Sequence, residues 1–172
     1  MADTAHAYWV GLGSNVGDRA AALQGAVDAL RAAGLDVDAV SPVFETAPQD
    51  LEDQPAFLNA AVRVRTGLDP RALLALLKDT ERDMGRAAGG VRFGPRRIDA
   101  DILLWDGGAW CDDALEVPHP RLTRRRFAMA GPLAVEAGVT LPGGAPLADA
   151  FAAIDPASQP VRRLPDADAS LH

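Results

Sequence analysis

The chain has 172 residues, of which 48% are hydrophobic and 24% charged, the balance of a soluble globular protein with one substantial core. Its net charge of −7 disfavours a protein that coats nucleic acid, because such proteins present a positive surface. Cys111 is the single cysteine, so no intrachain disulfide can form. The first residues lack a signal-peptide pattern and no apolar run is long enough to span a bilayer, so we expect a cytoplasmic protein without nucleic-acid or membrane partners.

The beginning of the sequence predicts a strand, a helix and a second strand. Residues 7–13 are mostly apolar and lead into a turn-rich segment, as at the end of a strand. Asp18 suits the N-cap of a helix with one apolar face, and Gly34 suits its C-cap. Residues 35–44 alternate imperfectly between apolar and polar side chains, which predicts a half-buried strand. Residues 46–55 are rich in Pro, Asp and Gln and predict an exposed loop.

The next part predicts a strand, a helix and another strand. Residues 57–65 alternate regularly, so Phe57 and Asn59 are expected to share one face of the strand. Asp69-Pro70 then provides an N-cap followed by proline at the first helical position. An arginine- and glycine-containing loop leads from this second helix to an apolar strand at 98–104.

The remaining sequence predicts shorter elements and a tail. A turn and a brief strand follow at 106–110, and a third helix, interrupted by Pro132, at 124–138. Residues 147–154 predict a short helix. The polar, proline-rich residues from about 156 predict a mobile tail.

The order strand, helix, two strands, helix, strand is typical of a ferredoxin-like α+β fold. We therefore expect an antiparallel or mixed sheet of about four main strands with packed helices. The sequence contains no internal repeat and no domain boundary, so residues 1–172 are expected to form a single domain.

Two carboxylates in the strand at 98–104 are the most informative feature. Asp99 and Asp101 point to the same face, because strand side chains alternate, while Ile98, Ala100, Ile102 and Leu104 point to the other. The pair could be a solvated edge that discourages aggregation. A divalent cation would relieve its repulsion, however, and oxygen ligands suit Mg²⁺. The arginines just before the pair favour the metal interpretation, with a polyphosphate as the ligand that the metal holds.

The loop before this strand carries Arg86, Arg92 and Arg96, with Gly89 and Gly90 at its centre. Surface arginines on a loop usually contribute little to stability. A glycine-rich loop with arginines at both ends can also fold over a bound triphosphate and stabilise its charge in the transition state. We favour this role for Arg86 and Arg96 and leave the alternatives open for Arg92.

Phe57 and Asn59 together suit a planar heterocycle, because a ring can stack on it and an amide can bind its edge. A packed Phe and an Asn bonded within the sheet are the commoner case, and the pattern places Phe127 in the core. His119, between two prolines, could bind a phosphate or a base, although a lone histidine is more often structural. It has no Cys or His companions at zinc spacing.

Taken together, these segments resemble the 6-hydroxymethyl-7,8-dihydropterin pyrophosphokinase family. The similarity covers nearly all of the chain up to about residue 142. The aspartate segment is highly specific to that family. The matching segments, in chain order, are residues 11–18, 54–62, 92–103, 117–121 and 126–127.

The resemblance implies a ferredoxin-like fold and transfer of pyrophosphate from ATP to the hydroxymethyl group of the pterin, with release of AMP, in folate biosynthesis. It implies two Mg²⁺ ions on Asp99 and Asp101, with Arg86 and Arg96 also catalytic. Pterin contacts are expected from Thr46, Pro48, Phe57, Asn59 and Phe127. ATP contacts are expected from Glu81, Arg86, Arg92, Arg96, Ile102, His119 and Arg125. We expect a monomer whose partners are these two small molecules.

Two other functions stay open on the sequence alone. A nucleic-acid-binding module is possible because ferredoxin-like sheets often bind single-stranded RNA, but the acidic charge and the few aromatic residues fit it poorly. A metal-dependent phosphohydrolase could use the same two carboxylates. It would release phosphate without any pterin.

Overall fold

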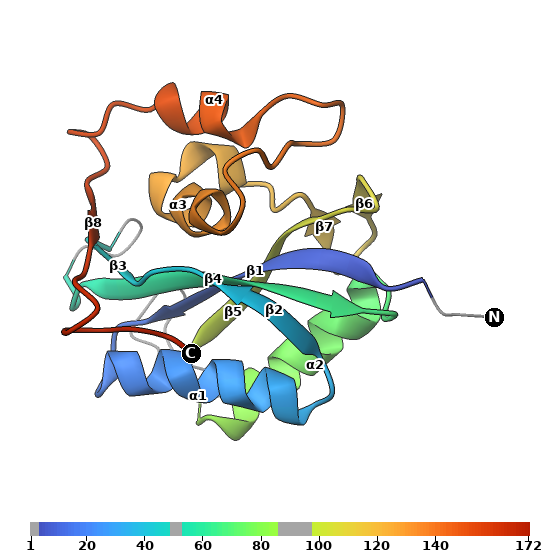
Figure 1. The fold of residues 1–172 in the computed structure, drawn as a ribbon, viewed down its shortest axis with the longest axis horizontal. Helices are drawn as coiled ribbons and strands as arrows, with labels where there is room; N and C mark the ends of the chain where they lie inside the picture. Colours follow the sequence, from blue (N-terminus) through green and yellow to red (C-terminus); the bar gives the residue numbers. More distant parts are fainter. Residues whose placement is uncertain (1–3, 49–52, 86–97) are drawn as a thin grey trace.

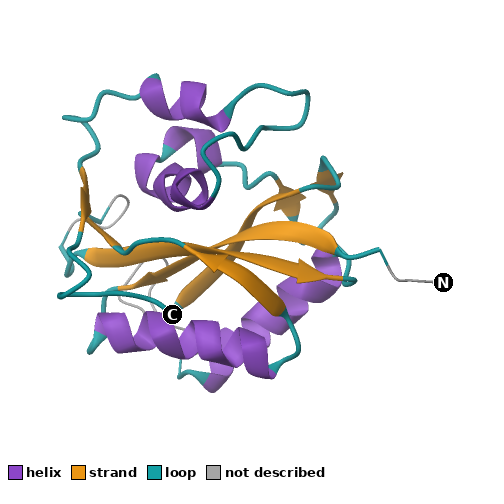
Figure 2. Ribbon diagram, in the orientation of Figure 1, coloured by secondary structure: helices purple, strands orange, loops and turns teal. Residues whose placement is uncertain are grey.

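A six-stranded antiparallel sheet lies between two pairs of helices in the computed structural model, which describes residues 4–48, 53–85 and 98–172 (Figure 1). One face of the sheet is covered by α1 (Arg19–Ala32) and α2 (Pro70–Asp83). The opposite face is covered by α3 (Arg126–Val135), with α4 (Leu147–Ala152) packed on its outer side (Figure 2). The molecule is therefore built of helix, sheet and helix layers.

The middle strand of the sheet is β4, and β1 is an inner strand between β4 and the edge strand β5. The strand order is β5-β1-β4-β3-β8, and β2 also pairs with β4. All of the described pairings are antiparallel. The strands of the sheet are β1 (His6–Ser14), β2 (Asp36–Val40), β3 (Phe44–Thr46), β4 (Phe57–Thr66), β5 (Asp99–Trp105) and β8 (Val161–Arg163). A separate small ladder joins β6 (Trp110–Cys111) and β7 (Glu116–Val117).

The expectation of about four main strands was wrong, partly because the predicted strand at 35–44 is two strands. Pro42 has no N–H group for a ladder, and β2 ends before it while β3 begins after it. Ser41 bridges the interruption. Its N–H donates to the carbonyl of Ala61 at 2.8 Å, and its hydroxyl accepts from the N–H of Ala61 at 2.8 Å. Both short strands consequently remain attached to β4.

The sixth strand, β8, comes from the segment for which composition predicted a mobile tail. In this structure β8 pairs with β3, and the chain then continues beneath the sheet to α1 (Figure 1). Three apolar side chains of the tail, Leu164, Ala169 and Leu171, are buried in the core. Their spacing among polar residues matches neither a helix nor a strand, so the sequence pattern did not reveal them.

Side-chain alternation along β1 divides the interior into two cores. Tyr8, Val10 and Leu12 pack against α1 and α2, whereas Ala7 and Trp9 pack against α3 and α4. The expected alternation of 57–65 is confirmed in β4. The expectation that Leu104 shares the face of Ile102 was wrong. In β5 the pairing with β1 shifts between Trp9 and Val10, so Leu104 packs on the α3 side.

The predicted starts of the first two helices are confirmed by side-chain caps. Asp18 accepts a hydrogen bond from the N–H of Ala21 at 3.0 Å, and Asp69 accepts one from Ala72 at 2.8 Å. The third helix begins at Arg126, after a 3₁₀ turn at Leu122–Arg124, and not at Arg124. None of the helices in the described ranges has the length and apolarity needed to cross a membrane.

Truncating Leu164 tests whether the tail is part of the fold. Leu164→Ala should lower the free energy of unfolding by about 2–3 kcal/mol, because it removes buried methyl groups and leaves a cavity. Val16→Ala, at a side chain that is 40% exposed, should change it by less than about 0.5 kcal/mol. Equal denaturation midpoints for the two variants would contradict packing of the tail.

Candidate active site

A cavity lies between the sheet and α3, over the end of β1 that follows Trp9. Its floor comes from β1, β4 and β5, one wall from the chain after β3, and its roof from α3. The described residues that line it are Gly11, Leu12, Gly13, Thr46, Ala47, Gln54, Phe57, Asn59, Ala60, Asp99, Asp101, Leu103, Arg125, Phe127, Ala128 and Pro132.

The acidic side of the cavity is formed by Asp99 and Asp101 on β5. The predicted alternation is confirmed: both carboxylates line the cavity, while Ala100 and Ile102 are buried in the core on the opposite face. Each aspartate lies beside a glycine of β1, because Asp99 pairs with Gly13 and Asp101 with Gly11. Each carboxylate therefore lies beside a position of the neighbouring strand that carries no side chain.

Two carboxylates facing a cavity are a suitable donor set for Mg²⁺. No group of three or more His, Cys, Asp or Glu that could hold a metal ion occurs within 4–48, 53–85 and 98–172. Mg²⁺ is commonly bound by one or two carboxylates, with waters and substrate phosphates as its other ligands. The pair therefore fits a cation that arrives with a polyphosphate better than one held in a closed protein cage.

Glu81 lies beneath the aspartate pair, on the opposite side of β5. This α2 side chain is only 3% exposed, and its Oε1 accepts a hydrogen bond from the N–H of Ala100 at 2.9 Å. The ε-ammonium of Lys78 donates to the same carboxylate at 3.2 Å. Glu81 thus holds the backbone between Asp99 and Asp101. It is not among the described residues that line the cavity.

The other side of the cavity is aromatic and polar. Phe57 and Asn59 line it from β4, as their shared face predicted. The side-chain amide of Asn59 donates from Nδ2 to Thr46 Oγ1 at 2.7 Å, and both residues are buried. This bond fixes the Asn59 amide in one orientation, with its Oδ1 near Gly13. Pro48 is not among the described lining residues, but its neighbour Ala47 is.

Phe127 and Arg125 reach the cavity from the start of α3. The sequence pattern placed Phe127 in the core, but it lines the cavity opposite the sheet. The guanidinium carbon of Arg125 lies 5.6 Å from the centre of the Phe127 ring, within the range of a cation–π contact. We call the part of the cavity between Phe57 and Phe127 the slot. It has an aromatic ring on each side and the charged side chain of Arg125 at its rim.

His119 lies beside the outer edge of β5. Its backbone N–H donates to the carbonyl of Leu103 at 2.9 Å, and its Nδ1 accepts from the N–H of Arg121 at 3.1 Å. Burial lowers the pKa of the imidazole below its usual value of 6.5, and the charges of Arg125 and Arg121 lower it further. A neutral ring with Nδ1 as acceptor leaves Nε2 as the N–H donor.

Some predicted site residues are not brought to the cavity. The side chain of Ile102 is in the core, so only its backbone could contact a nucleotide. Arg86, Arg92 and Arg96 lie outside the described residues, and the roles predicted for them stay predictions.

Two kinds of site residue were missed from the sequence. Gly11 and Gly13 were noted as the end of a predicted strand and as part of a segment that resembles the family, but not as the floor of a cavity. Their alternate spacing in the strand was the available signal. Gly131 was also missed. A Cβ there would lie 2.6 Å from the Cβ of Ala61 and 2.9 Å from its nitrogen. This close contact of α3 with β4 sets the height of the slot.

Gly131→Ala tests the close contact with Ala61, because the contact and helix propensity predict opposite changes in the free energy of unfolding. Helix propensity alone predicts stabilisation by up to about 1 kcal/mol. The contact with Ala61 predicts a loss of about 1–3 kcal/mol in the free energy of unfolding, because α3 must move away from β4. Gly138→Ala is the control, since a Cβ there meets nothing within 4 Å. A stabilised Gly131→Ala protein in denaturant unfolding would contradict the contact.

Comparison with known proteins gives consistent results. Residues 9–137 match the family model for 7,8-dihydro-6-hydroxymethylpterin-pyrophosphokinase (HPPK). The chain is 42% identical to the 2-amino-4-hydroxy-6-hydroxymethyldihydropteridine pyrophosphokinase of Methylorubrum extorquens over 149 residues, covering 86% of this chain and 93% of that one. It is 45% identical to the Bacillus subtilis protein of the same name over 127 residues, covering 73% and 75% of the two chains.

Other relatives are longer than this chain. A mitochondrial folate synthesis bifunctional protein of Pisum sativum is 47% identical over 121 residues, which are 70% of this chain but only 23% of the relative. A crystal structure described as HPPK-DHPS in complex with substrates superposes with a TM-score of 0.69 at 13% identity. It covers 86% of this chain and 43% of the other, which supports the fold alone. On the family match and the bacterial relatives, the chain belongs to the 7,8-dihydro-6-hydroxymethylpterin-pyrophosphokinase family.

Proposed function

We propose that this chain transfers the pyrophosphoryl group of ATP to the hydroxymethyl group of 6-hydroxymethyl-7,8-dihydropterin, giving AMP and the pterin diphosphate in folate biosynthesis. The observation that carries this proposal is one cavity with two functional sides. An aromatic slot with a fixed amide lies on one side of β1, and two carboxylates lie on the other. The names of the bacterial relatives agree with the proposal.

The aromatic side is the proposed pterin site. Phe57 from the sheet and Phe127 from α3 would stack on the two faces of the flat ring. Asn59, held by Thr46, would bind the edge of the ring through its carbonyl oxygen, which can accept from ring N–H or amino groups. Pro48 would complete the pocket through backbone atoms beside Ala47.

The acidic side is the proposed site of chemistry. The hydroxymethyl oxygen forms a bond to the β-phosphorus of ATP, the bond from that phosphorus to the α-phosphate oxygen of AMP breaks, and the hydroxyl proton passes to solvent water. Asp99 and Asp101 would hold Mg²⁺, expected as two ions. When bound, Mg²⁺ neutralises the charge of the phosphate oxygens. Glu81 supports this site through the backbone of Ala100, and its expected contact with ATP stands as a proposal.

The remaining nucleotide contacts are proposed from the rim of the cavity. Arg125 lines the cavity beside Phe127, where its charge can attract a phosphate. His119 would donate from Nε2, and Ile102 would contribute backbone atoms. Arg86 and Arg96 keep their proposed catalytic role, and Arg92 its proposed ATP contact, in a segment outside the described residues.

Other expectations also stand as proposals. The strand order β5-β1-β4-β2, with α1 and α2 on one face, supports a ferredoxin-like core. We further propose one domain over residues 1–172 and a cytoplasmic monomer that acts on ATP and the pterin, without nucleic-acid or membrane partners. The presence of a single cysteine is consistent with a reducing compartment.

AMP formation from ATP and Mg²⁺, measured with and without 6-hydroxymethyl-7,8-dihydropterin, tests the proposed reaction. We expect AMP only when the pterin is present, with one AMP for each pterin diphosphate. Release of inorganic phosphate without pterin would instead support a phosphohydrolase, and the proposal would be wrong.

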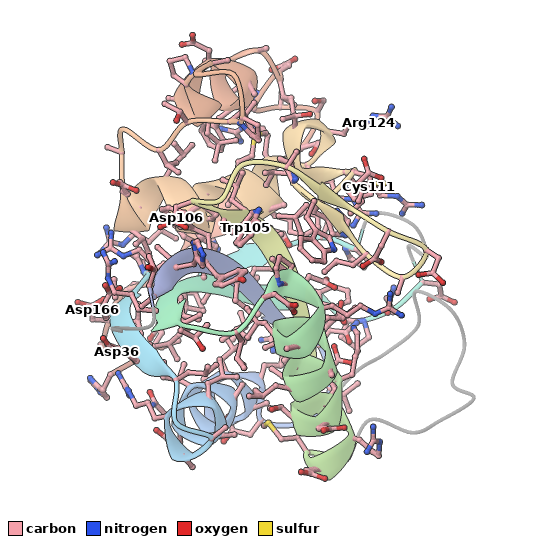
Figure 3. All side chains as sticks on the ribbon, turned by 90° about the vertical axis from the view of Figure 1, so that its right-hand side faces the viewer. Asp36, Trp105, Asp106, Cys111, Arg124 and Asp166 are labelled. Atoms are coloured by element: carbon pink, nitrogen blue, oxygen red, sulfur yellow. The ribbon has the colours of Figure 1, made fainter. Side chains whose placement is uncertain are left out.

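Asp101→Asn tests the acidic side. The change keeps the size of the side chain but removes its charge, so kcat should fall by about 100-fold or more. Mutating a residue that only hydrogen-bonds to a metal ligand already lowers activity by about 10- to 100-fold. Asp106→Asn is the matched control: Asp106 follows the far end of β5, where its Oδ2 accepts from the N–H of Ala7 at 3.1 Å (Figure 3). Normal turnover by folded Asp101→Asn protein would remove Asp101 from the site.

A further inference from the structure

We propose that Gln159, in the segment between α4 and β8, is a positioning residue for the pterin slot. This inference rests on the function proposed above and adds a part of the chain that lies beyond the family match, which ends at residue 137. None of residues 138–172 is among the described residues that line the cavity. Gln159 must therefore act through its neighbours and not by touching substrate.

The side chain of Gln159 holds the start of α3 on both sides of Arg125. Its Oε1 accepts from the N–H of Arg126 at 3.0 Å, and its Nε2 donates to the carbonyl of Arg124 at 2.9 Å. The first N–H groups of a helix need acceptors from outside the helix, and Arg125, the N-cap residue, provides no side-chain cap. The amide of Gln159 takes that place. The side chain of Arg124 itself extends away from the molecule (Figure 3).

Arg126 strengthens the same attachment. Its Nη1 donates to the backbone carbonyl of Gln159 at 3.1 Å, and its guanidinium carbon lies 4.3 Å from the centre of the Phe151 ring on α4. Arg126 is thus engaged outside the cavity, while its neighbours Arg125 and Phe127 line the inside. Fixing Arg126 fixes the direction in which these two neighbours project.

Two residues after Gln159, the chain joins the opposite wall of the slot. Val161 pairs with Thr46 in the β8–β3 ladder, and Arg162 forms an ion pair with Glu45 at 2.8 Å. Thr46 is the residue that holds Asn59. One short segment therefore connects the helix that carries Phe127 with the strand that orients the edge-binding amide. This connection limits how far the two walls of the slot can separate.

The test uses Gln159→Met in the full chain, which removes both amide hydrogen bonds at nearly constant size. We expect the dissociation constant for 6-hydroxymethyl-7,8-dihydropterin, measured by isothermal titration calorimetry, to rise about five- to tenfold, as expected for one or two lost hydrogen bonds. The value of kcat at saturating pterin should change less than about twofold. Gln159→Glu retains the acceptor for Arg126 and should recover part of the affinity.

Gln24→Met is the control, because Gln24 also bonds to the tail through both ends of its amide, in addition to a bond from Nε2 to Asp28 on α1. Its Oε1 accepts from the N–H of His172 at 2.9 Å, and its Nε2 donates to the His172 carbonyl at 3.2 Å, on the side of α1. This variant should lose comparable thermal stability and keep the pterin affinity of the unchanged protein. Comparing Gln159→Met with Gln24→Met distinguishes an effect on the slot from a general loss of tail stability.

The outcomes distinguish this inference from the proposed function. If the unchanged protein binds no pterin and forms no AMP, the proposed function is wrong and the inference falls with it. If the unchanged protein binds pterin and Gln159→Met binds it equally well, only the inference is overturned. Should Gln159→Met fail to fold, the Gln159→Glu variant decides: affinity equal to that of Gln24→Met at a temperature where both are folded overturns the inference.

Discussion

Side chains are missing from the inner strand β1 at Gly11 and Gly13, and this gap lets the cavity form. A Cβ at Gly13 would lie 3.1 Å from Oδ1 of Asn59, and one at Gly11 would lie 3.0 Å from a methyl carbon of Leu103. Earlier on the same face of β1, Trp9 occupies the space beneath α3 as part of a core. The face thus changes from core to cavity within a few residues, and any side chain at either glycine would crowd a neighbour that lines the site.

The antiparallel register then places different chemistry on the two sides of β1. Gly13 is paired with Asn59 on β4 and with Asp99 on β5. Neighbouring strands are about 5 Å apart, so the amide and the carboxylate arise from backbones about 10 Å apart across the glycine floor. That separation suits a flat heterocycle beside a phosphate group. The helices serve this arrangement from both faces: α2 supports β5 through Glu81, and α3 closes the slot from above.

Local patterns predicted the parts of this site that lie within single strands. The alternation at Phe57 and Asn59, and that at Asp99 and Asp101, assigned each pair to one face, and the resemblance to a family suggested their roles. The N-caps at Asp18 and Asp69 were equally local signals. Each of these inferences used only residues close together in the sequence and the regular spacing of side chains along a strand or helix.

Features that depend on contacts between distant segments could not be predicted in this way. The position of Phe127 depends on how α3 packs against β4, and the helical pattern alone placed it in the core. Ser41 bonds to Ala61 across the break at Pro42, and the pattern around Pro42 does not predict this contact. The tail looked mobile because its buried residues are sparse and its anchors, including the two amide hydrogen bonds of Gln159, reach residues far away in sequence.

The most direct test of this account is a crystal structure of the chain with 6-hydroxymethyl-7,8-dihydropterin, Mg²⁺ and a non-hydrolysable ATP analogue. The account predicts the pterin ring between Phe57 and Phe127, its edge at Asn59, and the metal-bound phosphates at Asp99 and Asp101. A pterin bound outside this slot, or phosphates that do not approach the two aspartates, would contradict it.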